Sequence, residues 1–316
     1  MTESWEQKGI WEAYKNDLHE RLSSKPHLVR PSPLPVEDYM DTYVGQSAKQ
    51  YLRNYSSGQP FFCKISFGGP HEPWDAPEPY ASMYSPRSMP AALKKFKDTA
   101  KRPVGSIDSK PSPELSEQEV QAMRANYAGN ISLIDDQIGE ILETLENKGV
   151  LDNTLILFTS DHGEMNGDHG FIHKGNMLDA AVRVPLIIAP PKASHSPFPS
   201  KHSSPVEWID IGPTIVEYAQ GSINYQQYGR SLKHVIDGKN DTHRVYAISE
   251  YNGEVMIMNQ QWKLVVNKFG EPYLLFDRKN DPDEQANLAG NKDYQNIEFE
   301  LCKKILCRLL ISQPGQ

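Results

Sequence analysis

The apolar run from Thr154 to Ser160 constrains the fold of this chain more than any other feature. Its residues favour β structure and do not alternate with polar ones, which is typical of a strand buried on both faces of a mostly parallel sheet. The sequence therefore predicts an α/β fold in which helices sandwich that sheet. With 316 residues, 38% of them hydrophobic, the chain is long enough to bury such a core.

Ionisable side chains gather directly after this run, interleaved with four glycines. They are Asp161, His162, Glu164, Asp168, His169, His173 and Lys174. Ligands of open α/β sheets bind outside the carboxyl ends of the strands, where glycines let the backbone turn sharply. Asp161 offers an oxygen ligand for Ca²⁺ or Mg²⁺, His162 offers a nitrogen, and Lys174 suits a phosphate or sulfate oxygen. We therefore expect a metal and anion site here instead of a solvated loop.

A second candidate lies after the apolar run Phe61–Phe67, which predicts another strand. Gly68, Gly69 and Pro70 end that run, so His71 falls in a loop just past the strand. From the residues alone, a surface histidine remains an alternative interpretation of His71.

Helices are predicted in three regions of the first half of the chain. Residues 1–30 are helical in part, and residues 37–54 form a helix with Met40, Tyr43, Val44, Ala48 and Tyr51 on one side. A long amphipathic helix starts at Ser116, whose capping partner is Glu119, and ends at Gly149. Asp135 and Asp136 belong to its charged outer face and are not expected to be catalytic. Residues 80–113 are predicted to form a long surface loop.

The second half changes character after about Thr242. A strand at Val182–Ala189 and a helix at Asp210–Gly221 precede that point. Four strands then follow without intervening helices, which predicts a small antiparallel sheet, and a final helix packs on it. These elements are expected at residues 245–250, 254–258, 262–267, 272–276 and 297–311. The expected domains are residues 1–242 and residues 243–316.

Charge and cysteine content exclude several classes of protein. The formal net charge of -8 argues against a nucleic-acid surface, which needs clustered lysine and arginine. No run is long and apolar enough to span a membrane, and the N-terminus lacks the apolar core of a signal peptide. Cys63, Cys302 and Cys307 have no disulfide-framework spacing, so reduced thiols are expected.

Five segments, in order, resemble the sulfatase family of the alkaline phosphatase-like superfamily. Three are PFFCKISFGGPHEPWDAPEPY, VRVPLIIAPP and WKLVVNKFGEPYLLFDRKNDPDEQANLA; the others are the long helix and the TLILFTSDHGEMNGDHGFIHKG stretch that it precedes. The resemblance implies a sulfuric ester hydrolase of the arylsulfatase type. It also implies an alkaline phosphatase-like α/β fold with a small C-terminal antiparallel sheet plus helix.

The resemblance assigns roles to individual residues. Asp161 and His162 correspond to ligands of a divalent metal, most often Ca²⁺, with Mg²⁺ as the alternative. His71 and Lys174 correspond to catalytic residues: the histidine helps to protonate the leaving oxygen, and the lysine binds a sulfate oxygen. His169 and His173 are expected to line the substrate-binding pocket.

Three family features are missing from these 316 residues: a strand with paired aspartates, a Cys/Ser-x-Pro-x-Arg motif that yields the formylglycine nucleophile, and a Gly-Lys-Trp-His segment that binds sulfate. Ser109–Pro113 has proline in place of the arginine, and its Pro/Ser-rich composition indicates a linker. The chain is therefore expected to be a truncated or split sulfatase, poorly active alone, whose partner is a missing N-terminal segment or another subunit. Two alternatives stay open: a phosphatase or phosphomutase of the same superfamily, and a non-catalytic anion-binding protein.

Overall fold

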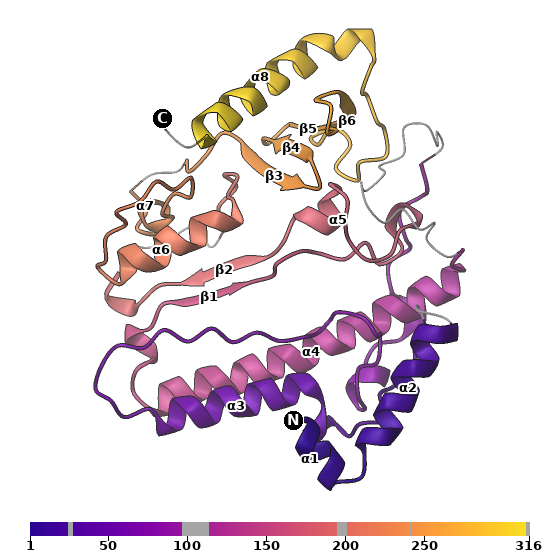
Figure 1. The fold of residues 1–316 in the computed structure, drawn as a ribbon, viewed down its shortest axis with the longest axis vertical. Helices are drawn as coiled ribbons and strands as arrows, with labels where there is room; N and C mark the ends of the chain where they lie inside the picture. Colours follow the sequence, from indigo (N-terminus) through magenta and orange to yellow (C-terminus); the bar gives the residue numbers. More distant parts are fainter. Residues whose placement is uncertain (25–27, 97–113, 195–200, 240–241, 314–316) are drawn as a thin grey trace. The chain divides into compact units, whose positions relative to one another are not determined.

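The computed structural model describes residues 1–24, 28–96, 114–194, 201–239 and 242–313 (Figure 1). The chain divides into two compact units. The first comprises Met1–Ala92 and Glu114–Asp152, and the second comprises the described residues of Leu93–Pro113 and Asn153–Gln316. The predicted boundary between residues 242 and 243 stays a prediction.

The first unit is helical. Its helices are α1 (Thr2–Gln7), α2 (Trp11–Ser24), α3 (Met40–Asn54) and α4 (Glu117–Asn147), and Figure 1 shows α3 alongside α4. The predicted capping box is confirmed, because Ser116 Oγ accepts a hydrogen bond from the Glu119 N–H at 3.2 Å and the Glu119 carboxylate accepts the Ser116 N–H at 2.9 Å. Gly149, at φ +71°, follows the end of α4 as expected.

The side of α3 predicted to carry its apolar residues is only partly buried. Ala48 of that side is buried, but Tyr43 and Tyr51 are exposed, and Asp41 and Gly45, which were not predicted, are buried. The small residues face inward because the two helices approach closely, and a Cβ at Gly45 would lie 2.3 Å from the Gln137 side chain of α4. The positions of the apolar side chains did not predict the face of α3 that contacts α4, because a close helix contact is made by residues with small side chains.

The predicted strand at Phe61–Phe67 is extended but has no ladder in the described part of the chain. A ladder needs a neighbouring strand to accept and donate backbone hydrogen bonds, and the described residues of the first unit contain no strand. The segment ends where predicted, at Gly68 and Gly69. Their N–H groups donate to the buried carboxylate of Asp41 at 2.7–3.1 Å and so anchor the His71 loop to α3.

The second unit contains a two-stranded ribbon and a four-stranded sheet (Figure 1). The ribbon pairs β1 (Ile156–Thr159) with β2 (Leu186–Ala189) in antiparallel register, Leu157 opposite Ile188. The sheet is antiparallel, as expected, in the order β3 (Ala247–Tyr251), β4 (Glu254–Met258), β5 (Trp262–Val266) and β6 (Pro272–Asp277). Short helices are α5 (Asp179–Val182), α6 (Ile211–Tyr218) and α7 (Lys233–Ile236), and the final helix is α8 (Gln295–Ser312).

Both faces of the four-stranded sheet are covered within this unit. On one face, Ile257, Leu264 and Leu275 pack against Leu301 and Ile305 of α8. On the other face, alternate residues of the same strands pack against the segment that follows β1. Those core residues are Met256, Val265, Leu274 and Phe276 from the sheet and Met165, Met177, Leu178 and Ala181 from the segment. Because successive residues of a strand point to opposite faces, the same strands pack against α8 on one face and hold the segment in place on the other.

The prediction that β1 is fully buried is wrong for this chain. Phe158 is 37% exposed and Ile187 of β2 is 62% exposed. A two-stranded ribbon has only one neighbour for each strand, so its apolar side chains keep contact with water.

No helix in the described part of the chain is long and apolar enough to cross a membrane.

Candidate metal and anion site

The candidate site is the loop that runs from the end of β1 to the start of α5, residues 160–178. The loop doubles back on itself: the Met165 N–H donates to the His173 carbonyl at 2.9 Å, and the Gly167 N–H donates to the Phe171 carbonyl at 2.8 Å. The turn needs left-handed backbone at Gly167 (φ +94°) and Gly170 (φ +78°). These conformations are the physical reason for the glycines seen in the sequence.

Gly163 is required for a different reason. Its N–H donates to the Ala181 carbonyl at 2.8 Å, and a Cβ at this position would lie 1.9 Å from the Ala180 carbonyl oxygen. The start of the loop therefore lies directly against α5. This contact fixes the backbone beside His162.

Asp161 and His162 occupy the first turn of the loop. The Asp161 side chain is 80% exposed, and its Oδ2 lies 3.8 Å from His162 Nε2. His162 Nδ1 is 2.9 Å from the Gly163 carbonyl oxygen, which can only accept, so Nδ1 carries the proton and Nε2 presents its lone pair. A carboxylate and an imidazole lone pair at this separation fit two ligand positions of one divalent cation, and the bond from Nδ1 is the usual orienting contact of such a ligand.

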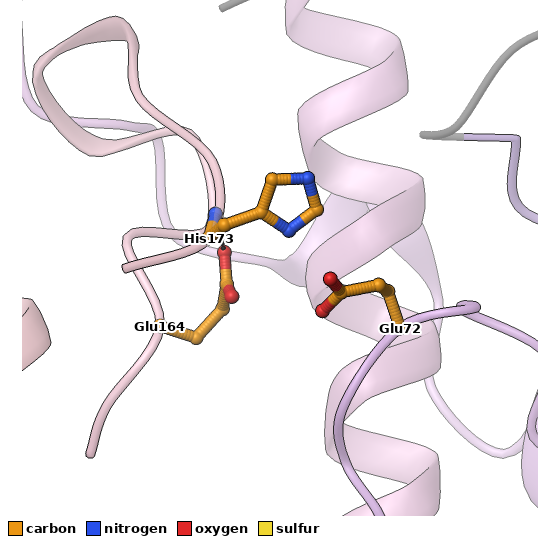
Figure 2. Close-up of side chains that lie close together, drawn as sticks. All are labelled: Glu72, Glu164 and His173. Carbon is orange, nitrogen blue, oxygen red and sulfur yellow. Dashed lines mark hydrogen bonds between the residues drawn. The ribbon is translucent and has the colours of Figure 1, made fainter. Parts of the chain in front are cut away.

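Glu164 holds the far side of the loop. Its carboxylate accepts the His173 backbone N–H, as Figure 2 shows, and the Asn166 N–H at 3.1 Å. His173 and Lys174 are half-buried, and His173 has φ +67°. The carboxylate thereby fixes the backbone that carries both residues. Glu72, also drawn in Figure 2, belongs to the first unit.

His169 is packed within the second unit. It is 3% exposed, its ring stacks on Phe96 with centroids 4.6 Å apart, and the Gln285 amide lies 3.2 Å from Nδ1. Burial lowers the pKa of His169, against the opposing charges of Asp168 and Asp281. These contacts give it a part in shaping the loop; its role in substrate binding stays a prediction.

Lys263 of β5 stabilises the end of the loop and was not expected from the sequence. Its fully buried ammonium donates to the Met177 carbonyl at 3.1 Å and pairs with the carboxylates of Asp179 and Glu284. Glu284 in turn accepts the Asp179 N–H at 2.8 Å. A lysine inside the otherwise apolar run WKLVV was the available signal, because a buried lysine needs an anionic partner.

His71 lies in the first unit, in the loop after Gly68 and Gly69. Its Nδ1 is 2.8 Å from the Glu72 carbonyl oxygen and 3.1 Å from Glu72 Oε2. The carbonyl oxygen can only accept, so Nδ1 is the donor in this contact too. The side chain is about half exposed. The predicted Pro/Ser-rich stretch Ser109–Pro113 lies outside the described residues.

Comparison with known proteins finds related families, sequences and structures. A family model described as "Sulfatase" matches residues 3–222, and one described as "N-sulphoglucosamine sulphohydrolase, C-terminal" matches residues 167–309. An arylsulfatase of Clostridium perfringens is 32% identical over 85% of this chain and 57% of its own length. The multifunctional alkaline phosphatase superfamily protein PehA of Trinickia caryophylli is 30% identical over 88% of this chain and 60% of its own length.

A solved structure of a phosphonate monoester hydrolase from Agrobacterium radiobacter superposes on 98% of this chain and 69% of that one, with a TM-score of 0.82 and 24% identity. This match shows the alkaline phosphatase-like α/β fold. The chain spans about three fifths of the length of the two curated relatives named above.

Proposed function

Because the chain belongs to the sulfatase family, we propose that it forms the metal- and sulfate-binding part of a sulfuric ester hydrolase of the arylsulfatase type. Asp161 and His162 bind a divalent cation, Ca²⁺ in preference to Mg²⁺, and Lys174 binds a sulfuryl oxygen. His71 assists the leaving oxygen, and His169 and His173 border the substrate. The observation that carries the proposal is that Asp161 Oδ2 and His162 Nε2, two atoms that can each donate an electron pair to one cation, lie 3.8 Å apart at the carboxyl end of β1.

Each residue has a defined part in the chemistry. A cation at Asp161 and His162 would supply positive charge at the reacting ester. The Lys174 ammonium stabilises negative charge on the sulfuryl oxygens by donating hydrogen bonds to them. His71 keeps one proton on Nδ1, so the proton it gives to the departing alcohol is the one gained at Nε2, and the Glu72 carboxylate beside Nδ1 stabilises the charged imidazole.

The nucleophile must come from a segment other than these 316 residues, which contain no Cys/Ser-x-Pro-x-Arg motif. We expect the purified chain to be poorly active alone and to act with a polypeptide partner that carries a formylglycine. The half-exposed apolar residues of the β1–β2 ribbon, including Phe158 and Ile187, support this proposal, because an uncovered apolar sheet face invites pairing with another chain.

Two other functions compete with this one. The similarity to an alkaline phosphatase superfamily protein favours a phosphatase or phosphomutase as the second candidate. The third is a non-catalytic protein that binds anions at Lys174. A panel of phenyl sulfate, phenyl phosphate and a phenyl phosphonate monoester, assayed with the chain and a partner segment supplied in trans, separates the three by the ester that is cleaved or by the absence of cleavage.

Calcium binding tests the metal ligands directly. We expect the chain, after treatment with EDTA, to bind Ca²⁺ by calorimetry, and we expect Asp161→Asn to weaken binding roughly tenfold or more, since a charged oxygen ligand is lost. Asp293→Asn, an exposed position of the same unit, is the matched control and should bind like the unmodified chain. Equal affinity in Asp161→Asn and the control would exclude Asp161 as a ligand.

Sulfate release tests the expected low activity. The purified chain should hydrolyse an aryl sulfate at close to the background rate, because positioning and charge stabilisation act on a reaction that still needs its nucleophile. Measurable release that Lys174→Ala abolishes and the exposed control Lys268→Ala preserves would contradict this expectation.

A further inference from the structure

A cavity of about 160 Å³ lies in the first unit, beside the His71 loop. Its walls come from α2, from the start of α3 and from the stretch Gly68–Asp75. The lining residues that matter here are Tyr14, Tyr39, His71, Glu72 and Asp75. The volume equals that of about five water molecules, which is enough for a small organic group.

The charged side chains that line the cavity are acidic. Asp75 is 2% exposed; its Oδ1 accepts the Tyr39 hydroxyl at 2.9 Å, and its Oδ2 has no hydrogen-bond partner among the described residues. Glu72 supplies a second carboxylate, and no lysine or arginine is among the lining residues. A buried carboxylate oxygen without a donor is costly, so the site is built to accept one.

Arg21, a buried cation whose charge acts on Asp75, does not serve as that donor. Arg21 of α2 is 1% exposed, and its guanidinium donates to the Asp17 carboxylate at 2.5 Å and to the carbonyls of Leu28, Arg30, Pro31 and Trp74 at 3.0–3.3 Å. Its charge still acts on Asp75. Even so, burial raises the pKa of Asp75 to about 6, against the lowering effects of the Tyr39 hydrogen bond and Arg21.

We propose that this cavity binds a primary ammonium group, held by the carboxylates of Asp75 and Glu72 and flanked by the rings of Tyr14 and Tyr39. An ammonium carries the N–H donors that Asp75 Oδ2 lacks, and its charge is attracted by both carboxylates and by aromatic faces. A quaternary ammonium has charge but no donor, and an alcohol has a donor but no charge. Anions are excluded by the two carboxylates.

The cavity also contains His71, the residue proposed to assist the leaving oxygen. Resting on the proposed function, the structure therefore assigns the cavity to the alcohol part of the substrate, which would carry an amine close to its ester oxygen. Binding of the ammonium itself does not depend on that function, so the two can fail separately.

The test is a titration of the ¹⁵N-labelled full chain with n-propylammonium chloride, 1-propanol and tetramethylammonium chloride in an amine-free buffer at pH 7.5. We expect propylammonium to shift amide signals of the stretch Gly68–Asp75 and to bind roughly tenfold or more tightly than the other two compounds. Asp75→Asn should weaken propylammonium binding by a similar factor. Glu78→Gln, an exposed glutamate of the same region that does not line the cavity, should leave it unchanged.

Every other result of this titration contradicts a specific part of the proposal. No binding, binding elsewhere, or equal binding to folded Asp75→Asn removes the cavity site, and tetramethylammonium binding as well as propylammonium removes the donor argument. If Asp75→Asn does not fold, Glu72→Gln, in a more open position, decides the matter in the same way. Propylammonium binding to a chain that cleaves no sulfate ester, even with its partner segment, would retain the site and refute only its assignment to a sulfate substrate.

Discussion

Asp75 in the first unit and Asp179 in the second are both carboxylates with little access to water, yet they have different partners. Asp75 accepts one hydrogen bond, from the neutral hydroxyl of Tyr39. Asp179 pairs with the Lys263 ammonium and with Arg278 at 3.1 Å. Burial raises the pKa of Asp75 to about 6, whereas Lys263 and Arg278 outweigh the burial of Asp179 and lower its pKa to about 2.

The difference separates a binding position from a structural one. The negative charge of Asp179 is neutralised by cations of the fold itself, and the pairing fixes α5 against the sheet. Glu284 shares Lys263 with Asp179, has no arginine partner among the described residues and is more deeply buried than Asp179, so burial raises the pKa of Glu284. Asp75 keeps an acceptor that the fold does not satisfy, which is the pattern expected of a group that awaits a ligand.

The largest effect should come from removing the buried ammonium of Lys263 in the second unit. Lys263→Met leaves Asp179 and Glu284 without their shared partner, and an uncompensated buried charge costs about 3 kcal/mol or more of unfolding free energy. Denaturant titration followed by hydrogen exchange of the β5 amides measures this loss. Lys268→Met, exposed on the same strand's continuation, is the matched control and should change stability by less than about 0.5 kcal/mol.

The comparison would fail if the two methionine variants had the same stability. Adding Glu284→Gln to Lys263→Met sharpens it, because the double variant removes one of the stranded charges. We expect the double variant to recover part of the lost stability, because the effects of substitutions at residues in direct contact are not additive.

The second prediction uses pH. A carboxyl whose pKa is raised on folding binds its proton more tightly in the folded state, so the first unit should gain stability as pH falls from about 7 to about 4. A shift from 3.8 to about 6 for Asp75 sets an upper bound of roughly 3 kcal/mol. The pKa of Asp179 is lowered on folding, so its contribution to the stability of the second unit is present above about pH 4. That contribution is lost as the pH falls towards 2.

Hydrogen exchange of α3 amides against β5 amides across this pH range reports the two units separately. The charged groups that act on Asp75 are Arg21, Asp17 and Asp41, with Tyr39 as hydrogen-bond donor. Asp75→Asn should flatten the first unit's response between pH 4 and 6 and leave the second unit unchanged. A response that survives in Asp75→Asn would assign it to another carboxyl, and the contrast with Asp179 would lose its basis.

The sequence allowed the local elements to be predicted but not their long-range partners. The loop after β1 was found because ionisable residues and glycines follow an apolar run, and the sheet was found because four strand-like segments follow one another without intervening helices. By contrast, the pairing of Lys263 with Asp179 joins residues 84 apart, and no local pattern carries it. Asp75 was missed for the same reason, since its environment comes from α2 and α3.

Burial was predicted less well than secondary structure. The composition of β1 correctly indicated a strand, but the exposure of Phe158 depends on which strands flank it. Phe61–Phe67 has strand composition and extended backbone, yet a ladder also requires a neighbour, which sequence pattern does not supply. The family resemblance supplied the roles of His71, Asp161, His162 and Lys174, which remain proposals.

The smallest expected effect concerns Glu164 and tests whether a charged side chain also stabilises the backbone of the candidate site itself. Glu164→Gln keeps an oxygen that can accept the His173 and Asn166 N–H groups but removes its charge, so about 1 kcal/mol of local stabilisation should be lost. We expect those two amides to exchange roughly fivefold faster and sulfate to bind a few-fold more weakly, because the backbone carrying Lys174 is less firmly held. Glu300→Gln on the exposed side of α8 should change neither quantity. Unaltered exchange in Glu164→Gln would mean that the left-handed turns and the Met165 core contact hold the loop without its carboxylate.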